Sequence, residues 1–228
     1  MTTVDRDVAT QDAGRAIDRA PELRAAEGTI AVLRWRFEAP LQVISSASVG
    51  GGIGHRDWVL NAQVSPDYAR TDLETHVAEL ASALGCTGAG VGMLTAARVS
   101  DVRTASDRGV QCFATVGVRD PTWAAAPFAI GDDTRPGTIN IVAFVPERLS
   151  DDALVNAVIT ATEAKTQALF EAGVAGTGTA SDAVCICCPT TGTAERFAGP
   201  RSEWGARLAR AVHATVAAGL PTGAGSRA

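Results

Sequence analysis

Three β-strand patterns follow one another before the first helix pattern, and this order constrains the fold more than any other feature of the sequence. Apolar and polar residues alternate over 29–37, and further strand patterns occupy 41–48 and 58–64. Apolar residues first recur at helical spacing over 72–84. A doubly wound parallel sheet requires strands and helices to alternate. The order therefore predicts an α+β fold, in which a few helices cover a mixed or mostly antiparallel sheet.

Strand and helix patterns continue through the rest of the chain, without an internal repeat or a long linker. Ser150 is a good N-cap, and two aspartates follow it in the first turn of a predicted helix. The remaining strand patterns lie at 89–94, 110–118, 138–145 and 183–187, and the remaining helix patterns at 150–171 and 202–220. We expect a polar N-terminal tail or peripheral helix over 1–27, a single domain over 28–220 and a flexible C-terminus over 221–228.

Composition and charge exclude several classes of protein. The 228 residues are 46% hydrophobic and 20% charged, which is an ordinary globular balance. The net charge is −5, and nothing in the sequence suggests the clustered basic surface of a nucleic-acid-binding protein, so we expect no nucleic-acid partner. We find neither an apolar segment long enough to span a membrane nor a secretory signal pattern. These observations predict a cytoplasmic protein with no membrane contact, and they leave its oligomeric state open.

The five cysteines argue against a disulfide framework, because their number is odd and the chain looks cytoplasmic. Cys185 and Cys187 would share one face of a strand, while Cys188 would point to the other. No second pair of cysteines or histidines completes a metal site at a usual spacing. We therefore interpret the cluster as small buried residues of a core strand, and we expect neither a metal nor a cofactor.

A glycine-rich run at 50–54 is the first candidate for a ligand-binding segment. A phosphate-binding loop would require a helix directly after the glycines, but a strand pattern follows here. Either the run forms a hairpin turn, or its backbone, including Gly51 and Gly52, comes close to a bulky ligand. His55 follows the run and is the histidine best placed for a site, whereas His76 and His213 are expected at the surface.

Lys165 is the single lysine among 20 lysine and arginine residues. It lies near the middle of the apolar face of the helix predicted over 150–171, so we expect it to be at least partly buried. Burial favours loss of its proton, which would suit a general base or a proton shuttle. Alternatively, Lys165 reaches the edge of the sheet and pairs with a carboxylate. Glu163 points roughly the opposite way on the same helix.

The segment 176–182 combines glycines, hydroxyl groups and a carboxylate in a short loop. Acyl-transfer sites use such groups as nucleophile, backbone N–H donors and orienting acid. Thr179 and Asp182 are the candidates that this loop supplies.

Taken together, these segments resemble the adenosylcobinamide amidohydrolase family from about residue 45 to about residue 215. The resemblance rests on eight short motifs in the same order, which is more specific than any one of them. They are Ser45-Ser46 with Gly50-Gly51-Gly52-Ile53-Gly54, Val59-Leu60-Asn61, Val91-Gly92-Met93-Leu94-Thr95-Ala96-Ala97, Ala114-Thr115-Val116-Gly117-Val118, Pro136-Gly137-Thr138-Ile139-Asn140-Ile141, Thr162-Glu163-Ala164-Lys165-Thr166, Gly178-Thr179-Ala180-Ser181-Asp182-Ala183 and Ala198-Gly199-Pro200.

The resemblance implies hydrolysis of the amide that joins the aminopropanol arm to the corrin ring of adenosylcobinamide. The products would be adenosylcobyric acid and 1-aminopropan-2-ol, and the partner a small corrinoid. The alternatives are an amidase or acyltransferase of the same scaffold that acts on another natural product, and a corrinoid-binding protein without catalysis. Our catalytic candidates are Lys165, Asp182, Thr179, Ser46 and Glu163. Our substrate-binding candidates are His55, Asn61, Thr95, Asn140, Gly51 and Gly52, and we expect the separated polar candidates to converge on one cleft.

Overall fold

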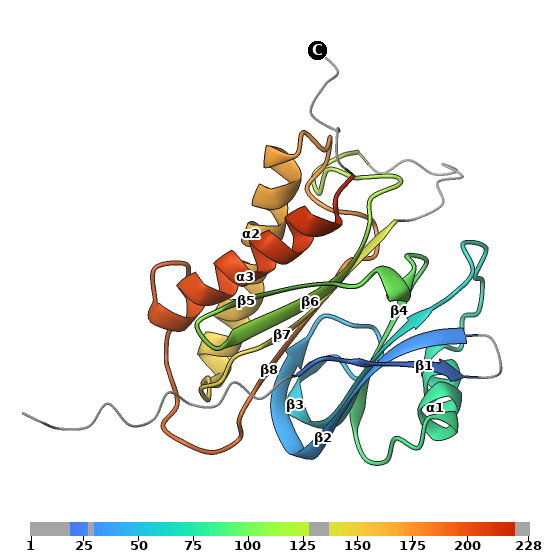
Figure 1. The fold of residues 1–228 in the computed structure, drawn as a ribbon, viewed down its shortest axis with the longest axis horizontal. Helices are drawn as coiled ribbons and strands as arrows, with labels where there is room; N and C mark the ends of the chain where they lie inside the picture. Colours follow the sequence, from blue (N-terminus) through green and yellow to red (C-terminus); the bar gives the residue numbers. More distant parts are fainter. Residues whose placement is uncertain (1–18, 27–29, 128–136, 222–228) are drawn as a thin grey trace, which may run out of the picture.

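The computed structural model describes residues 19–26, 30–127 and 137–221. Within these ranges the chain forms one mixed sheet of eight strands with three α-helices, which confirms the predicted α+β class (Figure 1). The strand order is β4-β3-β2-β8-β7-β6-β5, and β1 pairs with β2 beside this path. The strands are β1 (Glu22–Ala26), β2 (Ile30–Ser45), β3 (Gly52–Gln63), β4 (Gly90–Thr95), β5 (Arg103–Asp107), β6 (Val110–Gly117), β7 (Thr138–Phe144) and β8 (Ala183–Cys188).

The long strand β2 organises the sheet because two other strands share one of its edges. It pairs with β3 from Val32 to Ser45, while β1 pairs with its first five residues and β8 with its last four. The sequence predicts two strands here, interrupted at Pro40. The structure instead has one strand, whose register with β3 shifts between Arg36 and Leu41. Proline cannot donate a ladder hydrogen bond, so it is tolerated at such an irregularity without ending the strand.

The sheet curls strongly, so that strands distant in its order face each other. Asn61 of β3 donates a hydrogen bond to Thr115 of β6, although β2, β8 and β7 stand between them in the sheet. Asn140 of β7 likewise donates to the Leu94 carbonyl of β4. The inner face encloses an apolar core that includes Trp35. This curl brings polar side chains from both halves of the sheet together.

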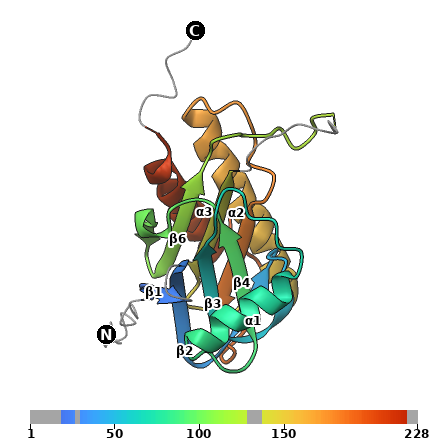
Figure 2. The ribbon, with the colours of Figure 1, turned by 90° about the vertical axis from the view of Figure 1, so that its right-hand side faces the viewer.

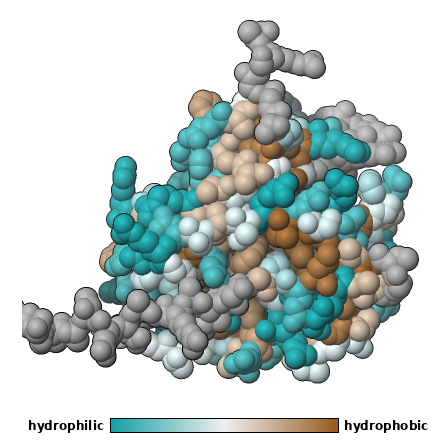
Figure 3. Space-filling view, viewed as in Figure 1, coloured by the Kyte–Doolittle hydropathy of each residue, from teal (hydrophilic) through white to brown (hydrophobic). Residues whose placement is uncertain are grey.

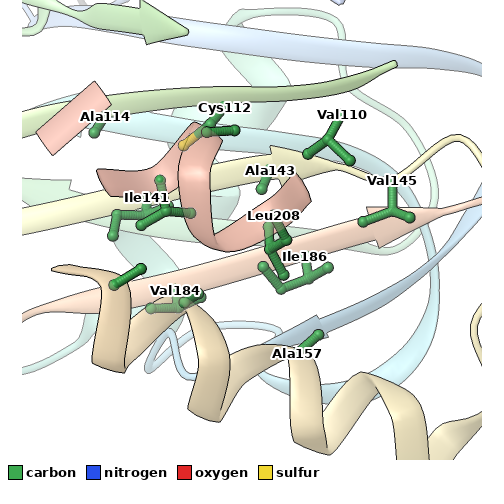
Figure 4. Close-up of a cluster of buried hydrophobic side chains, with 14 of the residues drawn as sticks. Val110, Cys112, Ala114, Ile141, Ala143, Val145, Ala157, Val184, Ile186 and Leu208 are labelled. Carbon is green, nitrogen blue, oxygen red and sulfur yellow. The ribbon is translucent and has the colours of Figure 1, made fainter. Parts of the chain in front are cut away.

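Helices cover the outer face of the sheet at two places. The helices α2 (Asp151–Glu171) and α3 (Glu203–Gly219) pack against β6, β7 and β8, and α1 (Leu73–Ala83) packs against β3 and β4 (Figure 2). Figure 4 shows the larger of the two resulting cores, where Leu208 of α3 meets Ile186 and Ala143 of the sheet. No helix in the described part of the chain is long and apolar enough to cross a membrane. On the face shown in Figure 3, hydrophobic residues lie in small groups among hydrophilic ones.

Two further local predictions differ from the structure. Residues 22–26 form β1 and not a tail or peripheral helix, because their main chain completes the free edge of β2. His76 was expected at the surface, but its side chain is buried. Its Nδ1 atom lies 2.7 Å from the hydroxyl of Tyr68, and the two rings stack. The segment that follows β3 therefore covers the polar side of α1.

Candidate active site

A cavity of about 470 Å³ lies where five segments meet. Its walls come from the turn after β2, the segment after β3, strand β4, the start of β7 and the loop before β8. The polar residues expected from the sequence that line it are Ser46, Thr95, Asn140 and Asp182. Residues far apart in the sequence are thus brought together around one space.

Asp182 is held in the cavity wall by four hydrogen bonds. Its Oδ1 atom accepts from the Ile139 amide at 2.9 Å and from the Thr179 hydroxyl. Its Oδ2 atom accepts from the Thr179 amide at 3.1 Å and from the Lys165 ammonium. A carboxylate offers about four lone-pair positions, so all are engaged. These bonds fix the loop before β8 against the first residues of β7.

Lys165 lies directly behind Asp182, on the face of α2 that packs against the sheet. Only 6% of the residue is exposed, which confirms the burial predicted from helical spacing. It forms an ion pair with Asp182, as the alternative interpretation of this lysine required. Gly178 makes this approach possible, because a Cβ atom there would lie 2.5 Å from both the lysine nitrogen and Asp182 Oδ2. A buried, hydrogen-bonded ion pair therefore borders the cavity.

A second polar group crosses the inside of the curled sheet. Asn61 donates to the Thr115 hydroxyl at 3.0 Å, and Asn140 donates to Asn61 Oδ1 at 2.9 Å and to the Leu94 carbonyl at 3.1 Å. The three polar side chains are each at most 2% exposed. Asn140 Oδ1 is buried and has no hydrogen-bond partner among the described residues. Asn140 is thus a lining residue whose enclosed Oδ1 atom is an acceptor that the described protein groups leave unused.

The predicted convergence of polar residues holds only in part. Lys165 and Thr179 adjoin the cavity through Asp182, and Asn61 adjoins it through Asn140. Glu163 is exposed on α2 and is not among the lining residues. His55 is also exposed and outside the lining, and its Nε2 atom lies 3.1 Å from the Gln42 side-chain oxygen.

The glycine-rich run forms the turn between β2 and β3 and continues into the first residues of β3. Gly51 and Gly52 are not among the residues that line the cavity. Gly50 has φ of +70°, and a Cβ atom there would lie 1.9 Å from the Gly90 carbonyl oxygen. The Arg56 guanidinium donates to the carbonyls of Gly50 and Gly51 at 2.9 and 3.2 Å. Of the two interpretations of this run, these contacts favour the hairpin turn.

Sequence reasoning missed several polar residues of this region. Thr115 completes the group around Asn61, and Ser181 and Tyr68 line the cavity. The Ser181 hydroxyl lies 2.9 Å from that of Thr138. One signal in the sequence could have indicated Thr115. A polar residue on a strand face whose other residues are apolar is expected to have a buried polar partner, and Thr115 shares its face with the apolar Phe113. That signal does not show which strands face each other.

Comparison with known proteins identifies the family to which this arrangement belongs. The sequence pattern of the adenosylcobinamide amidohydrolases matches residues 17–228. The chain belongs to the adenosylcobinamide amidohydrolase family. Its relatives include the adenosylcobinamide amidohydrolase of Methanosarcina mazei, which is 32% identical over 83% of this chain and 92% of that protein. The protein of the same name from Halobacterium salinarum is 32% identical over 77% of this chain and 78% of its own length.

The cysteine cluster of this family member lies in the core, apart from the cavity. Cys185 and Cys187 project to the inner face, with their sulfur atoms 3.9 Å apart, while Cys188 projects to the outer face as its strand position predicts. Burial raises the pKa of the Cys187 thiol well above its usual value. Within the described ranges, no three histidine, cysteine, aspartate or glutamate side chains are grouped to hold a metal ion.

Proposed function

We propose that this chain hydrolyses the amide that joins the aminopropanol arm to the corrin ring of adenosylcobinamide. The products are adenosylcobyric acid and 1-aminopropan-2-ol, and we place the reaction in the cytoplasm. Membership of the family supports the substrate. The observation that carries the chemistry is the enclosed Lys165–Asp182 pair in the wall of a cavity. A lysine and a carboxylate held together beside a cavity are side chains that can carry a proton in general acid–base catalysis.

The size of the cavity indicates which part of the substrate enters it. A volume of about 470 Å³ suits a ligand of drug size or smaller. The corrin ring with its adenosyl ligand is larger than such a molecule. We therefore place the aminopropanol arm and its amide inside the cavity, with the ring at the mouth.

We assign proton transfer to Lys165 and its orientation to Asp182. All four acceptor positions of Asp182 are already occupied, so the carboxylate has no free position for a proton from water. Lys165 does not itself line the cavity, so its ammonium gives a proton to the amine nitrogen through one water molecule as the carbon–nitrogen bond breaks. The attacking water supplies the new carbon–oxygen bond and returns a proton to Lys165, so the ion pair ends as it began.

We favour direct attack by water over a covalent intermediate. Ser46 lines the cavity, but its hydroxyl accepts a hydrogen bond from the Val184 amide, and among the described residues it donates none to a side-chain base. Thr179 contacts Asp182 but is not among the lining residues. Rapid quenching during turnover, followed by intact-protein mass measurement, tests this choice. Protein carrying the mass of an adenosylcobyric acyl group would instead identify a hydroxyl nucleophile.

The function itself is tested by incubating adenosylcobinamide with the protein and analysing the small molecules by mass spectrometry. We expect equal amounts of adenosylcobyric acid and 1-aminopropan-2-ol. The variant Lys165→Met, Asp182→Asn serves as the control, because it removes both charges together. A protein that bound cobinamide and released no amine would be a corrinoid-binding protein. Release of an amine only from other amides would favour the alternative amidase.

A further inference from the structure

The amide of Asn140 has only one orientation available to it. Both Nδ2 hydrogens are donated, one to Asn61 Oδ1 and the other to the Leu94 carbonyl. Asn61 is in turn oriented because its oxygen accepts from Asn140, which leaves its nitrogen to donate to the Thr115 hydroxyl. Turning the Asn140 amide over would place its oxygen against two acceptors that offer no hydrogen. The three residues therefore keep Oδ1 as the group left to bind something else.

The free acceptor lies beside the candidate catalytic group. The residue before Asn140, Ile139, donates its amide to Asp182, and Asn140 itself pairs with Ala183 in the next strand. Asn140 and Asp182 both line the cavity. Asn140 Oδ1 is buried without a partner among the described residues, which costs free energy unless a ligand supplies a donor. With both hydrogens engaged, Asn140 cannot donate to a developing oxyanion.

We propose that Asn140 Oδ1 accepts a hydrogen bond from the N–H of the scissile amide, and that Asn61 and Thr115 are the positioning residues that present this oxygen. The inference rests on the hydrolysis proposed above. A secondary amide offers one N–H to this acceptor, whereas an ester of the same shape offers none. The acid product places carboxylate oxygens against Oδ1, which disfavours its binding. The buried acceptor thus selects an amide over an ester and weakens retention of the product.

A threonine series tests the positioning role. Thr115→Val removes the hydroxyl that accepts the hydrogen bond of the Asn61 nitrogen, and Thr115→Ser keeps it. With adenosylcobinamide, we expect Thr115→Val to lose about ten- to a hundredfold in kcat/KM, which corresponds to one buried hydrogen bond. With the matching ester, in which oxygen replaces the amide nitrogen, it should lose much less. Thr115→Ser should restore the preference for the amide.

Thr215→Val is the matched control, because Thr215 is a buried threonine of α3 whose hydroxyl donates to the Ala211 carbonyl. It should leave the preference for amide over ester unchanged. Equal losses on both substrates in Thr115→Val, or no loss on either, would overturn the inference. A wild-type protein that does not cleave adenosylcobinamide would instead contradict the proposed function.

A measurement on the wild-type protein keeps the inference testable if Thr115→Val does not fold. Two neutral derivatives of adenosylcobyric acid, the primary amide and the methyl ester, are compared as inhibitors. The amide supplies an N–H at the position of the scissile bond and the ester does not. We expect the amide to inhibit about tenfold more strongly. Equal inhibition by the two would show that Asn140 Oδ1 does not accept a hydrogen bond from the N–H of the scissile amide.

Discussion

The ammonium group of Lys165 on α2 donates a hydrogen bond to Asp182 in the loop before β8, and both side chains are largely enclosed. The two residues are 17 positions apart and come from different elements. Their contact ties α2, the loop and the start of β7 to the cavity wall. Removing either charge therefore affects stability as well as chemistry.

The first prediction concerns stability. From sequence alone, Lys165→Met should fit the apolar face of its helix. In the structure it leaves Asp182 with an unpaired charge in a side chain only 12% exposed, so we expect a loss of about 3 kcal/mol in the free energy of unfolding. The double variant Lys165→Met, Asp182→Asn should recover most of that loss. Urea unfolding followed by circular dichroism measures all three proteins.

A surface pair provides the control for this series. Arg98 and Asp101 form an ion pair whose side chains are 74% and 50% exposed. Arg98→Met should change the free energy of unfolding by less than about 1 kcal/mol, because water already screens such a pair. If Lys165→Met lowered the free energy of unfolding no more than this control does, the enclosed pair would stabilise the fold no more than a surface pair.

The second prediction concerns turnover. Lys165→Arg keeps the positive charge, but a guanidinium stays protonated at any working pH. We expect a folded protein that loses about 10²- to 10⁴-fold in kcat, the usual contribution of general acid–base catalysis. A folded Lys165→Arg protein with near-normal kcat would leave Lys165 only a structural charge.

The third prediction concerns alkaline pH. Burial raises the pKa of the Cys112 thiol from 9.0 to about 12. In the unfolded chain the thiol ionises near its ordinary pKa, whereas in the folded chain it stays protonated up to about pH 12. Its stabilising contribution is therefore complete below pH 9 and decreases between pH 9 and about pH 12. Unfolding measured across this range should show a decrease that is smaller in Cys112→Ala.

Cys86 supplies the comparison for the alkaline series. It is only partly buried, whereas Cys112 is fully buried, and burial raises its pKa as well. Cys86→Ala should therefore alter the slope of stability against pH less than Cys112→Ala does. An equal effect of the two variants would contradict the assignment of the slope to burial.

The fourth prediction concerns metals. A cysteine binds a metal as the thiolate, and burial holds the Cys187 thiol in its protonated form by raising its pKa. We therefore expect hydrolysis of adenosylcobinamide to survive prolonged treatment with a strong chelator. The assay is the same mass measurement, before and after removal of the chelator. Activity that is lost in chelator and restored by zinc would require a different interpretation of the cysteines.

Local patterns in the sequence were enough for several features of this protein. The succession of strands before the first helix predicted the α+β class, because element order limits the possible layers. Helical spacing predicted that Lys165 would be buried, and strand alternation predicted that Cys185 and Cys187 would share a face apart from Cys188. Each of these results depends only on a residue's position within its own element.

Other features depend on which elements meet, and local patterns carry no information on that. Asn61 and Thr115 are 54 residues apart, and they touch only because the sheet curls until β3 and β6 face each other. His76 has a polar position on its helix, yet the segment containing Tyr68 covers it. The unpaired oxygen of Asn140 is likewise a property of its assembled neighbours. The sequence by itself determined most of the elements and most of their buried faces, whereas the tertiary pairing of strands decided which polar groups share the cavity.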